Sequence, residues 1–226
     1  MSVLALDEVT KLHPGSPPVA ALRSVTLCIA SGEFAAVVGP SGSGKSTLLA
    51  IAGTLERPTS GSVRVAGVAV DAMADHELSA VRAHAIGFVF QQFFLVPTLS
   101  TLDNVANGLL YRGTPVAERR KAARVALDAV GLTHRLEHRP SELSGGECQR
   151  TAIARALVGT PAIILADEPT GNVDTAQGAE ILEILWGLNA TGVTVVVVTH
   201  NREIADTLPR VVSLRDGVVE SDVRRR

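Results

Sequence analysis

The sequence predicts an α/β fold in three parts, and three stretches of the chain carry this prediction. A glycine-rich loop at 39–47 stands between an apolar strand and a helix. From residue 161 onward, apolar strands and a helix alternate as in βαβ units. Residues 92–158 carry mainly helical signals. We therefore expect one domain over 1–226, with a core made of 1–91 and 159–226 and a helical insertion at 92–158.

Composition limits the classes of protein to which the chain can belong. Hydrophobic residues make up 46% of its 226 residues, aromatic residues only 3%, and the mean hydropathy is +0.26. No apolar run approaches the ~20 residues that a membrane-spanning helix needs. A net charge of −2 and a pI of about 6.3 argue against a nucleic-acid partner. The two cysteines have no metal or redox spacing, which favours a reduced, cytoplasmic setting.

The N-terminal part of the core carries several strand signals. The first strand begins with Leu4 and Leu6, and the second covers Val25–Ile29, in which Cys28 is expected to be a small buried hydrophobe. Residues 62–70 read as a hairpin that turns near Gly67. We expect these strands to form an antiparallel layer around the glycine-rich loop.

The middle of the chain begins with a strand at 86–91 that ends in Gln91. Four phenylalanines crowd at positions 88, 90, 93 and 94, which favours core packing and leaves a partner-binding groove as the alternative. A helix is predicted from Thr114-Pro115 to Val130, with Gly131 just beyond its end. Another helix is predicted to begin near Ser144.

The C-terminal part supplies the remaining strands of the core. Residues 162–166 and 193–199 read as buried strands, and 210–220 as a hairpin that turns at Asp216-Gly217. Between the two buried strands, apolar residues recur at helical spacing and mark one face of a helix. These residues are Ile181, Leu182, Ile184, Leu185 and Leu188.

The loop itself fits the pattern G-x-x-x-x-G-K-[ST], which binds phosphate. Its glycines allow backbone N–H groups to turn inward, next to a helix N-terminus that favours an anion. Lys45 is expected to reach the β- and γ-phosphates, and the Ser46 hydroxyl to ligate Mg²⁺. The alternative is a chance glycine-rich turn between strand and helix. The predicted nucleotide-binding residues of the loop are Gly39, Pro40, Ser41, Gly42, Ser43, Gly44, Lys45, Ser46 and Thr47.

Polar residues at the ends of other strands fit the same chemistry. Asp167 and Glu168 follow the strand at 162–166, and we assign Asp167 to the metal and Glu168 to polarising the attacking water. His200 follows the strand at 193–199 and is expected to contact the γ-phosphate. Gln91 is a candidate for Mg²⁺ or the attacking water. The alternatives are that the two acids only open the loop before Pro169, and that the histidine is structural or merely exposed.

A second helix start also suits an anion. Ser144 can cap the helix and Glu147 can complete the cap, while Gly145 and Gly146 leave their amides bare. A single chain with one nucleotide needs only one phosphate cradle. On physics alone, an ordinary helix start remains the alternative.

With these motifs the chain resembles the ATP-binding subunits of ABC transporters. The motifs stand in that family's order: phosphate loop 39–47, glutamine loop Gln91, signature 143–149, acidic pair Asp167-Glu168, D-loop 171–174 and switch histidine His200. The resemblance implies a RecA-like phosphate-loop NTPase core with an N-terminal antiparallel β subdomain and a helical subdomain. It also implies ATP hydrolysis with Mg²⁺.

The resemblance further implies a head-to-tail homodimer, or a pseudo-dimer with a second ATPase subunit. Each ATP would lie between one subunit's phosphate loop and the other's Ser144-Gly145-Gly146, with Asp174 near the opposing site. A separate membrane permease would insert a coupling helix near Phe93–Leu99, which places the chain at the cytoplasmic face of the cell membrane. DNA-repair and translation ATPases are disfavoured because the chain has no basic face and no second cassette.

Finer similarities point to one branch of the family. Four stretches are similar to ATPases of lipoprotein-releasing and macrolide-exporting transporters: Phe88–Gln91, Leu99–Val105, His138–Glu142 leading into the signature, and Gly171–Asp174. A regulatory ATPase of the cell-division type is the alternative function. Two positions depart from the family pattern. His13 stands where an aromatic residue usually stacks on adenine, and Cys148 stands where the signature often has Arg, Gln or Lys, directly after the phosphate-contacting residues.

Overall fold

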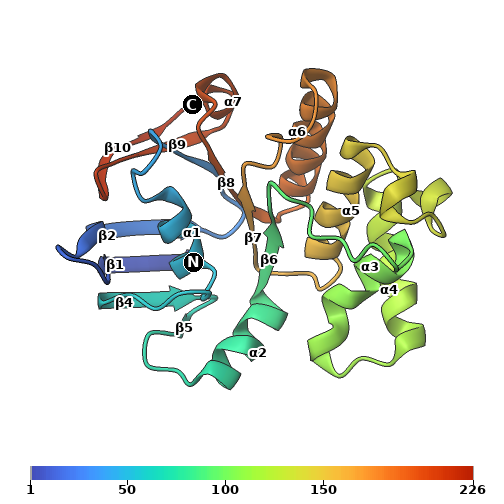
Figure 1. The fold of residues 1–226 in the computed structure, drawn as a ribbon, viewed down its shortest axis with the longest axis horizontal. Coiled ribbons are helices and arrows are strands. Elements are labelled where there is room, and N and C mark those ends of the chain that lie inside the picture. The colour runs from blue at the N-terminus through green and yellow to red at the C-terminus, as the bar shows by residue number, and fades with distance from the viewer. Residues whose placement is uncertain (1, 226) are drawn as a thin grey trace.

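The computed structural model describes residues 2–225, which form two sheets and a group of helices (Figure 1). Sheet A is antiparallel with the order β2-β1-β4-β5, and sheet B has the order β10-β9-β3-β8-β7-β6. The strands are β1 (Ser2–His13), β2 (Val19–Ala30), β3 (Phe34–Val38), β4 (Ser60–Val65), β5 (Val68–Ala69), β6 (Ile86–Val89), β7 (Ile163–Asp167), β8 (Thr194–Thr199), β9 (Arg210–Arg215) and β10 (Val218–Arg224). The α/β fold with an N-terminal antiparallel layer is confirmed.

The helices gather mainly on the side of sheet B away from sheet A (Figure 1). The α-helices are α1 (Lys45–Ala52), α2 (Asp75–Ala85), α3 (Thr101–Ala106), α4 (Val116–Ala129), α5 (Gly145–Leu157), α6 (Thr175–Ala190) and α7 (Arg202–Asp206). Short 3-10 helices cover Asn107–Arg112, Thr133–Arg135 and Pro140–Glu142. Among the described residues between 92 and 158, every regular element is helical, and α4 ends before Gly131 as its sequence predicts.

β3 lies inside sheet B, parallel to both β8 and β9. All five of its residues are buried, because side chains that alternate along the strand enter two different cores. Ala35 and Val37 pack with α1 and sheet A, whereas Ala36 and Val38 pack with the helices on the other face. The strand that leads into the phosphate loop is therefore fixed from both sides.

The parallel register brings three strand ends to one edge of sheet B. Val38 of β3 pairs with Thr199 of β8, and Asp167 of β7 pairs with Val198. The residues that follow these strands consequently emerge side by side. Ligands of open α/β sheets bind at this carboxyl edge.

Two predictions about the strands are corrected by the structure. Cys28 is exposed rather than buried, because Val25, Leu27 and Ile29 alternate with it and face the core of sheet A. The strand β6 ends at Val89, so Gln91 lies in the loop that follows rather than at the strand end.

No helix within residues 2–225 is both long and apolar enough to cross a bilayer.

Candidate functional site

The phosphate loop leaves β3 and turns into α1 at residues that only glycine can occupy. Gly44 has φ +101°, a left-handed conformation that side chains rarely adopt. A Cβ on Gly39 would overlap the backbone carbonyl of Leu214 in β9. The loop is also tied to the β9–β10 turn, since the Gly217 N–H donates to the Ser43 carbonyl at 3.1 Å. The loop is therefore shaped by packing against the C-terminal hairpin.

Lys45 and the start of α1 leave donors free for a phosphate. The Lys45 ammonium donates to the carbonyls of Gly39 and Pro40, at 2.8 and 2.9 Å, and so lies over the loop. Within the described chain, no side chain caps the first turn of α1. Uncapped N–H groups at a helix start, beside a lysine, form a site for an anion.

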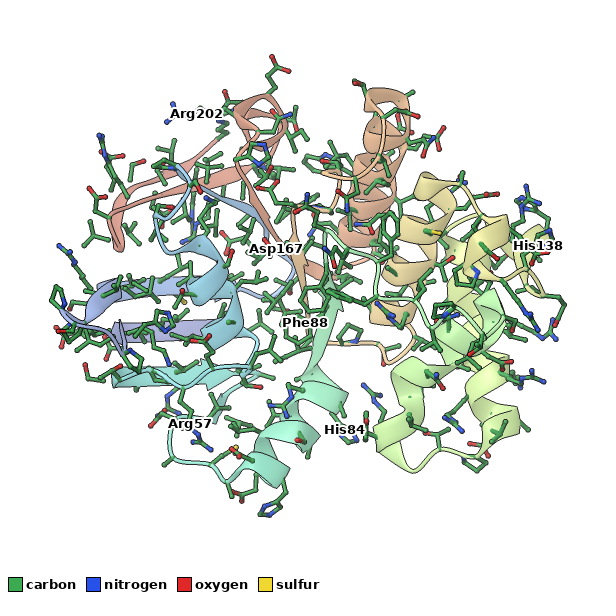
Figure 2. All side chains as sticks on the ribbon, in the orientation of Figure 1. Arg57, His84, Phe88, His138, Asp167 and Arg202 are labelled. Atoms are coloured by element: carbon green, nitrogen blue, oxygen red, sulfur yellow. The ribbon has the colours of Figure 1, made fainter. Side chains whose placement is uncertain are left out.

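A cavity of about 540 Å³ opens at this helix start. The cavity wall joins residues from the ends of three strands with the loop after β6. Asp167 lies near the middle of the molecule in Figure 2. Besides the phosphate loop, the residues that line the cavity are Val19, Ala20, Ala21, Gln91, Asp167, Glu168 and His200. The structure thus brings the predicted acids, glutamine and histidine together with Lys45 and Ser46.

The negative charge of Asp167 is poorly compensated by the groups around it, so a bound cation would stabilise it. Burial raises the pKa of Asp167, the charge of Glu168 raises it further, and only Lys45 opposes this. Within residues 2–225, no group of three or more His, Cys, Asp or Glu side chains is arranged to hold a metal. The residues that line the cavity do include Asp167, with its carboxylate, and Ser46 of the phosphate loop, with its hydroxyl. Two such oxygens fit Mg²⁺, which is usually bound by one or two protein oxygens together with phosphates and waters. Ser46 and Asp167 are the residues that would hold it.

Glu168 is held rigidly at the cavity wall. Its φ is +45°, a strained conformation of the kind found at functional sites. Its Oε1 accepts hydrogen bonds from the backbone N–H of His200 at 2.8 Å and lies 2.7 Å from His200 Nδ1. Its Oε2 accepts from the Thr199 hydroxyl at 2.9 Å. The end of β8 therefore orients the carboxylate predicted to act on water.

Gln91 lines the cavity but is engaged by the D-loop. Its Nε2 donates to Asn172 Oδ1 at 3.2 Å, and Asn172 Nδ2 donates back to the Gln91 carbonyl at 2.9 Å. His13, the last residue of β1, pairs with Val19, which lines the cavity. His13 itself is absent from the described cavity wall, so its stacking on adenine stays a prediction.

The signature segment forms the capping box that its sequence predicts. The Ser144 hydroxyl accepts from the Glu147 N–H at 3.2 Å, and Glu147 Oε2 accepts from the Ser144 N–H at 2.8 Å. The Ser144 amide lowers the pKa of Glu147, and Arg135, whose Nε donates to Glu147 Oε1 at 2.7 Å, lowers it further. Ser144, Gly145 and Gly146 do not line the cavity of their own chain.

The expectation that both signature glycines leave their amides bare is wrong for Gly146. Its N–H donates to Gln177 Oε1 at 2.6 Å. Gln177 belongs to the first turn of α6, whose N-cap is Asp174. Gln177 could not be predicted from the sequence, because nothing in the local pattern of α6 shows that this side chain reaches a helix start elsewhere in the chain.

A second missed residue is Gln149, which lies in α5 with no exposed surface. Its Nε2 donates to the Pro169 carbonyl at 2.6 Å and to the Phe90 carbonyl at 3.4 Å. It thereby connects the helical region with the loop after the acidic pair. The sequence signal that could have identified Gln149 is its position inside the signature segment, directly after Cys148.

Burial and the charge of Glu147 raise the pKa of the Cys148 thiol, which keeps it protonated and unreactive.

Comparison with known proteins agrees with this arrangement. The sequence profile of the ABC transporter family matches residues 22–171, which include the phosphate loop, the signature and the acidic pair. This chain belongs to the ABC transporter ATP-binding family. It is an ATPase of the cassette type, and ATP is its nucleotide.

Relatives of this ABC ATPase are found in several bacteria. An uncharacterised ABC transporter ATP-binding protein of Thermotoga maritima is 50% identical over 99% of this chain and 96% of its own length. The macrolide export ATP-binding/permease protein MacB of Brucella melitensis is 45% identical over 99% of this chain. The chain spans only 35% of that MacB protein.

A solved structure shows the same fold. The ATP-binding cassette MJ0796, captured as a dimer in a post-hydrolysis state bound to ADP and Pi, superimposes with a TM-score of 0.90. It is 44% identical, and the match covers 99% of both chains. The RecA-like cassette fold predicted from the motifs is therefore confirmed for this ABC ATPase.

Proposed function

We propose that this ABC ATPase drives a separate membrane permease by dimerising head to tail around two ATP molecules, each with Mg²⁺. One observation carries the proposal: Ser144, Gly145 and Gly146 lie outside the cavity that holds the phosphate loop. A second anion-binding helix start has no use in its own chain's site, but it can complete the site of a second copy. The dimeric state of MJ0796, bound to ADP and Pi, supports dimerisation of this chain.

Within each site, the residues have separate tasks. The phosphate loop and Lys45 bind the triphosphate, and Ser46 and Asp167 hold Mg²⁺, which neutralises charge on the phosphates. Glu168 accepts a proton from the attacking water, and His200 keeps its carboxylate in place through the 2.7 Å contact. Gln91 reaches the site when Asn172 releases it. Asp174 faces the opposing site of the partner subunit.

The decisive experiment uses Glu168→Gln, which keeps the shape of the side chain and removes its basicity. We expect hydrolysis to fall by roughly 10²–10⁴-fold. ATP should then accumulate and hold the dimer, which sedimentation and light scattering with Mg-ATP would detect. Glu183→Gln, an exposed change on α6, is the matched control and should hydrolyse ATP normally. A Glu168→Gln protein that stays monomeric at saturating Mg-ATP would contradict the proposal.

A second cavity, of about 370 Å³, fits a membrane partner. Phe88 (labelled in Figure 2), Phe90 and Phe94 line it, and the rings of Phe88 and Phe90 stack with centroids 5.4 Å apart. Phe94 is 61% exposed and Tyr111 is 84% exposed. Three of the four crowded phenylalanines therefore line a groove, and Phe88 also packs against the hydrophobic core beside sheet A. Grooved apolar surfaces of this kind receive protein partners.

The charges in this groove define the partner further. Arg82, Arg112 and Arg155 line it, and their guanidinium groups donate to backbone carbonyls at 2.8, 2.6 and 2.6 Å. Within residues 2–225, none of them forms a salt bridge with a carboxylate. We infer that the permease inserts a short helix with an apolar face and an acidic residue. The ATPase would then sit at the cytoplasmic face of the cell membrane.

The groove is tested by placing a charge on an exposed apolar residue. Phe94→Asp should remove the ATPase from washed membranes of cells that also produce its permease, because the carboxylate repels the acidic helix. Val125→Asp, at a residue of α4 that is 68% exposed and lies outside the groove, should leave the membrane-bound amount unchanged. Equal retention of both variants would contradict the inference. Similarity to the macrolide export protein MacB supports export as the transport class.

A further inference from the structure

Gln177 connects the signature helix with the D-loop inside one chain. Its side-chain oxygen accepts the Gly146 N–H at 2.6 Å. Asp174 holds the other end of the carboxamide, since Gln177 Nε2 donates to Asp174 Oδ2 at 2.7 Å. Asp174 Oδ1 also accepts the backbone N–H of Gln177 at 2.9 Å. A carboxylate only accepts hydrogen bonds, so the carboxamide nitrogen must face Asp174 and the oxygen must face Gly146.

The contact at Gly146 is close. A Cβ at this position would lie 2.5 Å from Gln177 Oε1 and 3.0 Å from Gln177 Cδ. The glycine therefore makes room for a side chain of its own chain. With the capping box, the amides of Ser144, Gly146 and Glu147 all have acceptors before any nucleotide arrives.

We propose that Gln177 is a positioning residue that occupies the Gly146 amide in the nucleotide-free chain and yields it to the phosphate of ATP bound by a second copy. This inference rests on the head-to-tail dimer proposed above. One N–H group cannot satisfy two acceptors fully, so the glutamine oxygen and the phosphate oxygen compete. Gln177 thereby sets the ATP concentration at which the dimer closes, and Asp174 shares in the same contact.

Two substitutions of opposite effect test the competition, both in the Glu168→Gln background so that ATP is not consumed. Gln177→Ala removes the competing acceptor and should lower the ATP concentration for half-maximal dimerisation by roughly fivefold, the equivalent of one neutral hydrogen bond. Gln177→Glu keeps an acceptor and adds negative charge near the incoming phosphate, and should raise that concentration. Analytical ultracentrifugation across an ATP titration measures both.

Two controls separate competition from damage. Glu183→Ala, at an exposed residue further along α6, should leave the ATP concentration for dimerisation unchanged. Binding of ATP to the monomer should be equal in all variants, because Gln177 lies outside the cavity of its own chain. In the nucleotide-free monomer, the Gly146 amide should exchange its hydrogen several-fold faster in Gln177→Ala than in the parent.

The outcomes are distinct. An unchanged ATP dependence in Gln177→Ala, or the same direction of change in the Ala and Glu variants, overturns the role of Gln177 while leaving the dimer intact. An unchanged exchange rate at Gly146 overturns it as well. If the Glu168→Gln parent itself does not dimerise with ATP, the proposed function fails and the role of Gln177 fails with it.

Discussion

The helices α1 and α5 both begin at glycine-rich turns that suit an anion, but their first turns are completed in different ways. At α1, no side chain of the described residues caps the helix, and Lys45 adds a positive charge. At α5, side chains of Glu147, Gln177 and Ser144 already accept the N–H groups of Ser144, Gly146 and Glu147. The first site is ready for phosphate in the isolated chain, whereas the second can offer its Gly146 amide to phosphate only by displacing Gln177.

The carboxylates near the two helix starts have pKa values shifted in opposite directions, which agrees with the difference between the two sites. Burial and Glu168 raise the pKa of Asp167 beside α1, so its charge is poorly compensated until a cation arrives. The Ser144 amide and Arg135 lower the pKa of Glu147 in α5, so its charge is satisfied already. The α1 end is thus built to gain from a ligand, and the α5 end to be stable without one.

Lys45→Ala should produce the largest effect, because it removes the charge from the open site alone. We expect ATP affinity to fall by roughly 100-fold, as expected for loss of one or two charge-assisted hydrogen bonds. Isothermal titration calorimetry with the Glu168→Gln protein measures the change. Lys121→Ala, an exposed change on α4, should bind ATP normally. Unaltered affinity in Lys45→Ala would mean that the loop amides alone hold the phosphates.

Ser144→Ala and Ser100→Ala remove the same kind of cap from two helices. The Ser144 hydroxyl accepts from the Glu147 N–H, and the Ser100 hydroxyl accepts from the Asp103 N–H at 3.1 Å. Each substitution should lower the free energy of unfolding by about 1 kcal/mol, measured by urea denaturation. Only Ser144→Ala should also weaken ATP-dependent dimerisation in the Glu168→Gln background. Equal dimerisation in both would show that the α5 end does not meet ATP.

The smallest effect is a pH dependence with opposite sign at the two ends. The folded pKa of Glu147 lies below its ordinary value of 4.5, so its carboxylate stabilises the fold above pH 4.5 and loses that effect as the pH falls through the folded pKa. Glu147→Gln should therefore destabilise the protein at pH 7, by less than about 1 kcal/mol because the amide still accepts hydrogen bonds. The difference from wild type should shrink in acid.

Asp167→Asn is the counterpart at the open end. The folded pKa of Asp167 lies above its ordinary value of 3.8, so the ionised side chain destabilises the nucleotide-free fold at neutral pH. The substitution should raise stability at pH 7, and this gain should shrink as the pH falls through the folded pKa. Urea denaturation of the nucleotide-free protein at several pH values measures both variants. Parallel pH profiles for Glu147→Gln and Asp167→Asn would contradict the contrast between the two ends.

The sequence predicts well those features that are encoded in one short stretch. The phosphate loop, the capping box at Ser144 and the end of α4 before Gly131 each depend on residues a few positions apart. The strand ends at Asp167 and His200 could also be predicted to meet, because parallel strands share an edge. The catalytic and metal-binding roles of these residues stay predictions that the experiments above address.

The rest depends on contacts between residues far apart in the chain, which no local pattern encodes. Examples are Gly146 with Gln177 and Gln91 with Asn172. Another is the buried Arg210, which hydrogen-bonds to both Glu33 and Asp222. Cys28 is different, because the alternation of Val25, Leu27 and Ile29 already assigned it to the exposed face. That error came from judging a residue type without its position in the strand.

The packing of the phosphate loop against the C-terminal hairpin has a consequence for the synthesis of the protein. Gly39 lies against the Leu214 carbonyl, and the Ser43 carbonyl accepts from Gly217. A ribosome makes residues 39–47 early, but the hairpin that shapes them is made only after β8 and α7. The nascent chain therefore cannot hold the phosphate loop in its final geometry until this hairpin has left the ribosome and docked. Nucleotide binding in that geometry thus reports that the hairpin has been made and has packed against the loop.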